Sequence, residues 1–342
     1  MKLQWTEADF EAGDLALSNG DTLHSARLHY HQIGTLNAPK DNLILLPTYY
    51  GGAAAGNHPW VGSNSPLDPN RYCIVIPSLL GAGESSSPSN TSGEQHGPGF
   101  PEIRLYDNVM IQKRLVDEVF GGASLALVMG WSMGGMQALQ WGCLFPDKVR
   151  SVLATCCTAR CYPHNRVFLE GVKAALTCDQ AFRGGHYDAP PEHGLRAFGR
   201  VYAGWAYSQA FFRHERWRDL GFDSIKSLLA FWEDDHLGQD ANNLLTVLNT
   251  WQRGDISDNP VFRGDYEAAL DAITMPTRIM PGSTDLYFTE EDAAGDADGM
   301  PGAILEPLPS EWGHIAGGAG RERNSHDRIL AAAGSLLNQR DQ

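Results

Sequence analysis

The chain has 342 residues, 42% of them hydrophobic, which is enough for one large core or for a core with an inserted cap. Forty-one acidic residues against 26 basic ones give a net charge of −15, which argues against nucleic acid and anionic membranes as main partners. No apolar run reaches the roughly 18 residues of a membrane span, and the first ten residues lack the apolar segment of a secretory signal, so we expect a cytoplasmic protein.

The first half of the chain alternates strand patterns with helix patterns. Residues 14–23 and 26–34 are expected as short strands joined through Asn19-Gly20-Asp21, a hairpin signal. Continuous apolar runs, typical of strands covered on both faces, follow at 42–47, 71–78, 123–130 and 149–155. Helical patterns lie at 106–121 and directly after Ser132. This alternation predicts a mostly parallel sheet with helices on both faces.

Residues 157–265 have a different pattern. They are rich in helix formers and aromatic residues and lack buried-strand runs, and Phe198, Tyr202, Trp205 and Gln209 fall at helical spacing. Strand patterns resume at 276–282 and 303–309, and a final helix is expected at 326–339. The predicted organisation is a core of residues 1–156 and 266–342, interrupted by a helical cap at 157–265.

Ser132 stands in the sequence Gly130-Trp131-Ser132-Met133-Gly134, a G-x-S-x-G element between a buried strand and a helix. A turn this tight strains the backbone at the serine and leaves room only for glycine at 130 and 134. It presents the hydroxyl at a helix N-terminus, where developing negative charge is stabilised. Ser132 is therefore the candidate nucleophile.

A serine nucleophile needs a base and an acid that orients the base. The order in this fold class is serine, acid, histidine, and only His314 and His326 lie beyond the last predicted strand. His326 falls at the start of the final helix, whereas His314 lies in the Gly-flanked loop SEWGHIAGG. We predict His314 as the base and Asp285, in the loop after strand 276–282, as the acid.

An oxyanion hole requires two N–H donors. The first is expected from Met133, the residue after the nucleophile, and the second from Tyr49 in the loop Thr48-Tyr49-Tyr50-Gly51-Gly52. An ordinary turn remains the alternative reading of that loop. The next Gly-rich loop, 78–90, lacks the Gly-Lys-Ser/Thr ending of a phosphate loop, so nucleotide binding is not expected.

Three cysteines and a histidine cluster in the sequence, namely Cys156, Cys157, Cys161 and His164. Their spacing fits no strong zinc pattern and no second ligand pair follows, so buried thiols are the expected reading and neither a metal nor a cofactor is predicted.

Over most of its length the chain resembles the homoserine O-acetyltransferase group of α/β-hydrolase-fold proteins. The segments that carry the resemblance are SMGGMQALQW after the strand, DANNLL at 240–245 and ALDAITMPTRIMPGSTDLYF. The resemblance implies Ser132, Asp285 and His314 as a catalytic triad, Tyr49 and Met133 as oxyanion donors, and a homodimer built through the cap. It also implies that Arg200, seven residues before Tyr207, binds a substrate carboxylate.

Two departures separate this chain from the transferases of that family. The catalytic histidine is followed by Ile315 in GHIAGG, where the transferases have an aspartate that pairs with the homoserine ammonium. The oxyanion loop reads PTYYGG in place of a HALTG-like run. An ammonium group facing isoleucine would lose its partner, at a cost of about 1–3 kcal/mol. The chain is therefore similar to the esterase branch of the family, in which water removes the acyl group.

The expected function is a serine ester hydrolase for small, acetate-type esters, acting through an acyl-serine intermediate. Tyr50, Trp131, Trp205 and Ile315 are candidate pocket walls, although each is equally compatible with core packing. Arg200 and Tyr207 complete the expected substrate pocket. The alternative is an acetyl-CoA-dependent homoserine O-acetyltransferase that uses Arg200. A hydrolase fold that has lost catalysis and acts as a binding protein is disfavoured, because all three triad residue types are present.

Overall fold

A single sheet of eight strands organises the computed structural model, which describes residues 3–338. The strand order is β1-β2-β4-β3-β5-β6-β7-β8, and only β1 and β2 pair in antiparallel fashion with their neighbours. The strands span β1 Thr6–Ala16, β2 Thr22–Ile33, β3 Leu43–Leu45, β4 Cys73–Pro77, β5 Leu125–Trp131, β6 Val152–Thr155, β7 Thr277–Met280 and β8 Ala303–Leu305. The mostly parallel sheet predicted from the sequence is confirmed.

Ten α-helices accompany the sheet within the described residues. They span α1 Leu105–Glu118, α2 Met133–Leu144, α3 Pro163–Thr177, α4 Glu192–Ala206, α5 Gln209–Arg213, α6 Ile225–Leu237, α7 Ala241–Gln252, α8 Tyr266–Asp271, α9 Glu290–Asp298 and α10 Arg323–Asn338. The last residue of the predicted final helix, residue 339, lies outside the description. No helix between residues 3 and 338 combines the length and the apolar character needed to cross a membrane.

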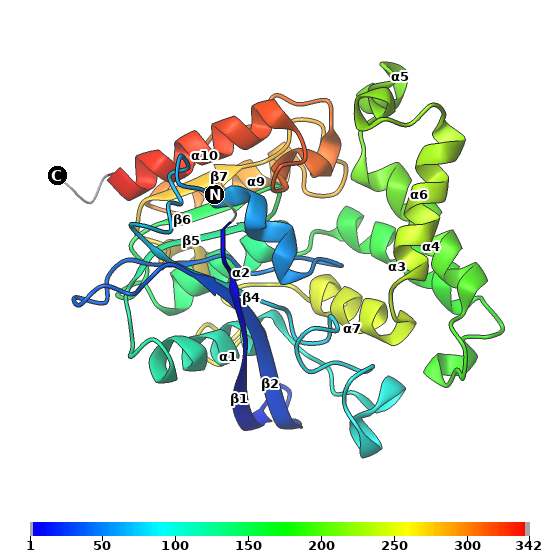
Figure 1. The fold of residues 1–342 in the computed structure, drawn as a ribbon, viewed down its shortest axis with the longest axis horizontal. Coiled ribbons are helices and arrows are strands. Elements are labelled where there is room, and N and C mark those ends of the chain that lie inside the picture. The colour runs from blue at the N-terminus through cyan, green and yellow to red at the C-terminus, as the bar shows by residue number, and fades with distance from the viewer. Residues whose placement is uncertain (1–2, 339–342) are drawn as a thin grey trace.

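Helices cover both faces of the sheet, as Figure 1 shows for α10 on one side and α1 on the other. Residues of β5 alternate between two apolar clusters because successive side chains of a strand point to opposite faces. Val128 packs in the cluster that contains Leu139 of α2, and Leu127 packs in the cluster that contains Ile329 of α10. All four side chains are buried, so β5 is the centre of the core.

The N-terminal hairpin differs in one respect from the prediction. Its turn is at the expected place, where Leu17 donates to the carbonyl of Asp21 at 2.9 Å, but β1 begins at Thr6 rather than at Asp14. The pairing shifts register on both sides of Gly13. Such bulges disrupt the two-residue alternation by which a strand is recognised in sequence.

The segment between β6 and β7 contains α3 to α8 and no strand of the sheet, and Figure 1 shows α3, α4, α6 and α7 gathered to one side. The helical character of this segment is thus as expected, whereas the domain boundaries at 157 and 265 remain a prediction. The helical spacing of Phe198, Tyr202, Trp205 and Gln209 does not continue through one helix, because α4 ends at Ala206. A second helix, α5, begins after Ser208, whose hydroxyl accepts the N–H of Phe211 as an N-cap.

A buried carboxylate joins the start of this segment to the core. Asp296 of α9 is 1% exposed and accepts hydrogen bonds from the N–H of Ala159 and the hydroxyls of Tyr162 and Tyr266. The guanidinium of Arg160 lies over both tyrosine rings. Burial is the main cause that raises the pKa of Asp296, so its hydrogen bonds offset part of a desolvation cost.

Replacing this carboxylate tests its role in stability. We expect Asp296→Ala to lower the free energy of unfolding by about 2–4 kcal/mol, because one buried and two partly buried donors lose their acceptor. Urea denaturation followed by circular dichroism measures the change. Asp298→Ala, at an exposed position of the same helix, is the control and should stay within about 0.5 kcal/mol of the parent. A loss below about 1 kcal/mol for Asp296→Ala would contradict this account.

Candidate active site

Ser132 occupies a strained turn between β5 and α2, with φ 57° and ψ −129°. A Cβ added to Gly130 would lie 2.1 Å from backbone atoms of Gly134, and one added to Gly134 would lie 2.6 Å from the carbonyl oxygen of Pro47. These distances confirm the steric reason predicted for the two glycines. Met133 is the first residue of α2, so its N–H has no carbonyl partner within the helix.

Asp285 and His314 form a buried pair. His314 Nδ1 lies 2.7 Å from Asp285 Oδ2, and the two side chains are 4% and 0% exposed. The other carboxylate oxygen, Oδ1, accepts the N–H groups of Tyr287 and Phe288, while the indole of Trp131 donates to the carbonyl of His314 at 3.0 Å. The carboxylate holds the proton of the imidazole on Nδ1, which leaves Nε2 able to accept one.

The loops that carry the acid and the histidine are also bonded to each other. Thr284 Oγ1 donates to the carbonyl of Ser310 at 2.7 Å and accepts the N–H of Gly313 at 3.1 Å. Gly313 opens the short helix η6, Gly313–Gly317, with φ 61°, a conformation that favours glycine. The position of His314 is therefore set by its backbone as well as by Asp285.

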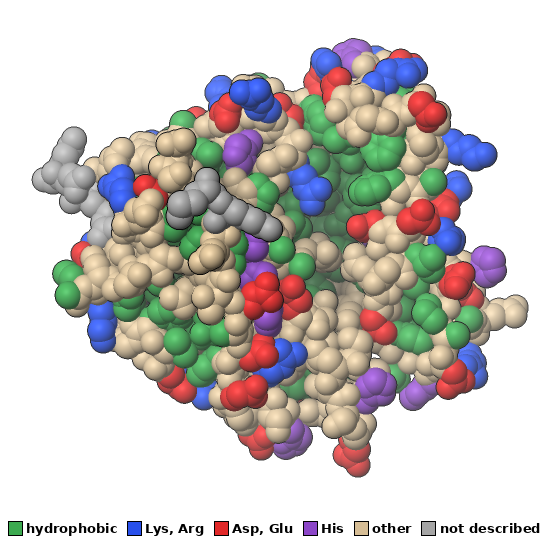
Figure 2. Space-filling model, in the orientation of Figure 1, with side chains coloured by type: hydrophobic (Ala, Val, Ile, Leu, Met, Phe, Trp, Pro, Cys, Tyr) green, Lys and Arg blue, Asp and Glu red, His purple; other side chains and the backbone are tan. Residues whose placement is uncertain are grey.

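Ser132 and His314 both line a cavity of about 430 Å³. Figure 2 shows a hollow lined by hydrophobic side chains beside α5 and α6. Four of the six expected pocket residues line the cavity: Tyr50, Trp131, Tyr207 and Ile315. The cavity has the size of a small-molecule site.

The other two expected pocket residues, Arg200 and Trp205, lie elsewhere, which corrects the sequence expectation. Arg200 is exposed and forms an ion pair with Glu233. It precedes Tyr202, which does line the cavity, by two positions, or about 200° around α4, so it points the other way. The ring of Trp205 packs instead against Phe168, with centroids 5.0 Å apart.

Several lining residues were not anticipated from the sequence: Tyr202, Trp232, Asp235, His236, Gln239, Tyr287, Trp312 and Arg321. A signal existed for Tyr287, because it follows Asp285 by two residues, and its ring lies 4.4 Å from that of His314. The sequence also contains a signal for Tyr202, because its helical spacing predicts a side chain packed in the interior. The lining residues of α6 belong to no motif, and only the folded chain brings them to the cavity.

The predicted oxyanion loop lies against the nucleophile turn. Gln137 of α2 donates to the carbonyl of Thr48 at 2.9 Å, and the ring of Tyr49 lies 4.4 Å from that of Trp131. Gly51 has φ 67°, and a Cβ on Gly52 would lie 2.5 Å from the ring of Tyr49. The two glycines therefore allow the turn to close over the tyrosine, while the donor roles of Tyr49 and Met133 remain predictions.

Cys156, the first residue of the cysteine cluster, lies beside the Asp285–His314 pair. Ligand atoms of Cys156, Asp285 and His314 fall within 4.8 Å of one another, but burial raises the pKa of the Cys156 thiol well above its usual range. Burial likewise raises the pKa of Cys161, to about 12. Neutral thiols bind metals poorly, and Asp285 is already bonded to His314. His164 packs against Trp205 rather than completing a ligand group with the cysteines among the described residues.

Comparison with known proteins agrees with this arrangement of strand, tight turn and histidine loop. Residues 41–316 match the family model described as alpha/beta hydrolase fold. The chain belongs to the α/β-hydrolase family. Its relatives within that family include esterases as well as homoserine O-acetyltransferases.

Two relatives and one solved structure show which members of the family this α/β-hydrolase is similar to. An ethyl acetate hydrolase from Pseudomonas veronii is 37% identical over 329 residues, or 95% of this chain and 93% of that protein. A homoserine O-acetyltransferase from Chlorobium chlorochromatii (strain CaD3) is 30% identical, with 87% of each chain covered. The structure of the acetyl esterase MekB matches with a TM-score of 0.93 at 36% identity, covering 98% of this chain and 97% of that one.

The Tyr49 turn can be tested through the reactivity of Ser132. We expect Gly52→Ala to slow covalent labelling by a fluorophosphonate at least about tenfold, because the new Cβ displaces Tyr49 and a misplaced oxyanion donor costs on the order of 10²–10³ in rate. Intact-protein mass spectrometry over time measures the labelling rate. Gly171→Ala in α3, where a Cβ meets nothing within 4 Å, is the matched control. An unchanged rate in Gly52→Ala would remove the turn from the site.

Proposed function

We propose that this α/β-hydrolase is a serine esterase that hydrolyses small carboxylic esters, acetates above all. The observation that carries the proposal is the buried Asp285–His314 pair beside a cavity that Ser132 also lines. The printed activities of the relatives, an ethyl acetate hydrolase and an acetyl esterase, support the same substrate class.

In the first half of the reaction, Ser132 Oγ attacks the ester carbonyl while His314 Nε2 takes its proton. Asp285 stabilises the imidazolium through Nδ1, and the N–H groups of Tyr49 and Met133 stabilise the oxyanion. The tetrahedral intermediate collapses to acyl-Ser132, and the alcohol leaves with the proton from His314. The C–O bond of the ester has been exchanged for a C–O bond to serine.

In the second half, His314 activates a water molecule, which attacks the acyl carbonyl. Collapse of the second intermediate releases the carboxylic acid and returns the proton to Ser132. Ile315, the residue after His314, lines the cavity with an apolar side chain. Such a wall favours an uncharged alcohol portion over the ammonium group of homoserine, because the ammonium would lose solvation without gaining a partner.

Two parallel assays distinguish this proposal from an acetyl-CoA-dependent homoserine O-acetyltransferase. One follows hydrolysis of alkyl and aryl esters from acetate to butyrate, and the other follows thiol release from acetyl-CoA with and without homoserine. We expect fast hydrolysis of acetates, no release stimulated by homoserine, and a loss on the order of 10⁴ or more in Ser132→Ala.

Thiol release stimulated by homoserine would overturn the esterase proposal in favour of the transferase. Unchanged hydrolysis in Ser132→Ala would remove the serine mechanism.

The same proposal includes a homodimer built through the segment 157–265 and a cytoplasmic location. Exposed apolar side chains support an interface in that segment: Val201, Leu220, Ile225 and Phe231 are 38–49% exposed. All six cysteines are free thiols, five of them buried, as is usual in a reducing compartment.

The interface has its own test. The parent should elute in size-exclusion chromatography with light scattering at about twice its chain mass of 37.4 kDa. We expect Ile225→Glu to shift it to the monomer, because a charge would be buried in an apolar contact. Lys226→Glu, at the adjacent exposed position, is the control. A monomeric parent would refute the dimer without bearing on the esterase mechanism.

A further inference from the structure

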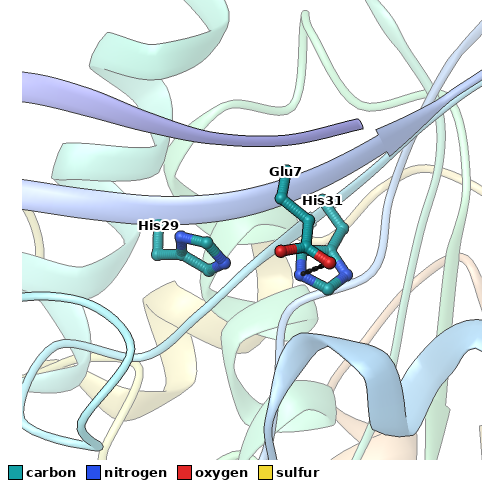
Figure 3. Close-up of side chains that lie close together, drawn as sticks. All are labelled: Glu7, His29 and His31. Carbon is teal, nitrogen blue, oxygen red and sulfur yellow. Dashed lines mark ion pairs between the residues drawn. The ribbon is translucent and has the colours of Figure 1, made fainter. Parts of the chain in front are cut away.

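One face of the N-terminal hairpin gathers acidic and imidazole side chains. The strand register pairs Glu7 with His31 and Asp9 with His29. Side chains two residues apart on a strand share a face, so all four stand on the same side of β1 and β2. Figure 3 shows Glu7, His29 and His31 together on one side of these two strands. None of them lines the ester cavity.

Three of these side chains direct potential ligand atoms at one point. The atoms offered by Glu7, His29 and His31 lie within 4.8 Å of one another, and Glu7 Oε1 is 3.7 Å from His31 Nε2. A tetrahedral ion with bonds of 2.0–2.1 Å separates its ligand atoms by about 3.4 Å. Glu7 is 66% exposed in its side chain and is free to close the remaining distance by rotation. A ring nitrogen of His29 points toward His31 in Figure 3.

Each of the two imidazoles has an outer partner on Nδ1. His29 Nδ1 lies 2.8 Å from Asp9 Oδ1, so it carries a proton and leaves Nε2 as the available ligand. His31 Nδ1 lies 2.8 Å from Nε2 of His58, which leaves His31 Nε2 facing Glu7. A carboxylate or other acceptor behind a ligating histidine is the usual second layer of a metal site.

The second layer is itself held in place. Asp9 is bonded to Arg27 at 2.6 Å as well as to His29. The ring of His58 stacks on Trp5, with centroids 3.9 Å apart and planes within 2°. His31 is only 4% exposed. The two imidazoles therefore keep their orientation, and only the exposed carboxylate of Glu7 has to move when an ion enters.

We propose that Glu7, His29 and His31 bind a divalent transition-metal ion of the zinc type, with water completing its coordination. Two imidazoles and one carboxylate suit Zn²⁺, Co²⁺ or Cu²⁺, whereas Mg²⁺ and Ca²⁺ favour sites made of oxygen atoms. The ion would clamp β1 to β2 and stabilise the folded chain. The absence of a metal expected from the sequence is thereby revised, and this site is independent of the esterase chemistry.

The test is calorimetric titration of the chelator-treated full chain with Zn²⁺. We expect one ion per chain, and at least a tenfold weaker affinity in Glu7→Gln and in His29→Gln, because each removes a ligand. His24→Gln is the matched control and should bind as the parent does. His24 faces Asp14 across the same hairpin at 3.1 Å, but among residues 3–338 it belongs to no group of three potential metal ligands.

Electron paramagnetic resonance of bound Cu²⁺ gives an independent readout of the ligands. Coupling to two imidazole nitrogens is expected in the parent and to one in His29→Gln. Zn²⁺ should also raise the melting temperature of the parent and of His24→Gln, but not that of Glu7→Gln. This readout distinguishes a lost ligand from a damaged fold.

Three results would overturn the proposal. The first is no Zn²⁺ binding by the parent at millimolar concentration. The second is binding that Glu7→Gln and His29→Gln leave unchanged, which would place the ion at another group such as the exposed thiol of Cys178. The third is a loss in His29→Gln alone, which would exclude Glu7 as a ligand.

Discussion

Backbone atoms of three segments meet around Ser132 at distances that exclude any Cβ. The end of β5, the first turn of α2 and the loop at Pro47 approach one another so closely that Gly130 and Gly134 have no substitute. The same close approach brings Tyr49 beside Trp131, the residue before Ser132, and bonds the carbonyl of Thr48 to Gln137. The serine, the Tyr49 turn and the helix N-terminus are therefore parts of one rigid unit, and the strain at Ser132 is held by the packing of that unit.

Parallel strands then bring the rest of the chemistry to this unit. The loops that hold Tyr49, Ser132, Asp285 and His314 all follow strands of one parallel sheet, so they meet at the same edge. The hydrogen bonds of Asp285 engage both carboxylate oxygens and leave the acid one orientation. In the proposed mechanism, this fixed pair would need no rearrangement when positive charge develops on the imidazole.

The segment between β6 and β7 supplies much of the cavity wall at that edge. Its aromatic side chains, with Ile315 from the histidine loop, leave a cavity of about 430 Å³. Arg200, which the family resemblance assigns to a carboxylate, is paired with Glu233 on the outside of α4. The antiparallel strands β1 and β2, at one side of the sheet, carry the histidine and carboxylate cluster of the hairpin, whose outer partner His58 lies in the segment η1, Ala54–Trp60, that follows the Tyr49 turn.

The sequence by itself determined the features that depend on neighbouring residues. The buried runs, the glycines around Ser132, the hairpin turn at Asn19 and Gly20 and the order of Ser132, Asp285 and His314 are all local patterns. They predicted the fold, which is confirmed, and the triad residues, whose catalytic roles remain a prediction. Local patterns succeed here because a tight turn or a buried strand restricts the residue types at consecutive positions.

Only the tertiary structure decided which distant side chains share a space. Nothing near Arg200 in the sequence indicates that it forms an ion pair with Glu233 on the outer face of α4. Likewise, no spacing in the sequence predicts that Glu7 pairs with His31 or that His236 lines the cavity. The start of β1 was also missed, because bulges at Gly13 interrupt its alternation. These features depend on strand register and helix rotation. A shift of one residue turns a side chain to another face, and packing across the whole chain fixes which register and rotation are adopted.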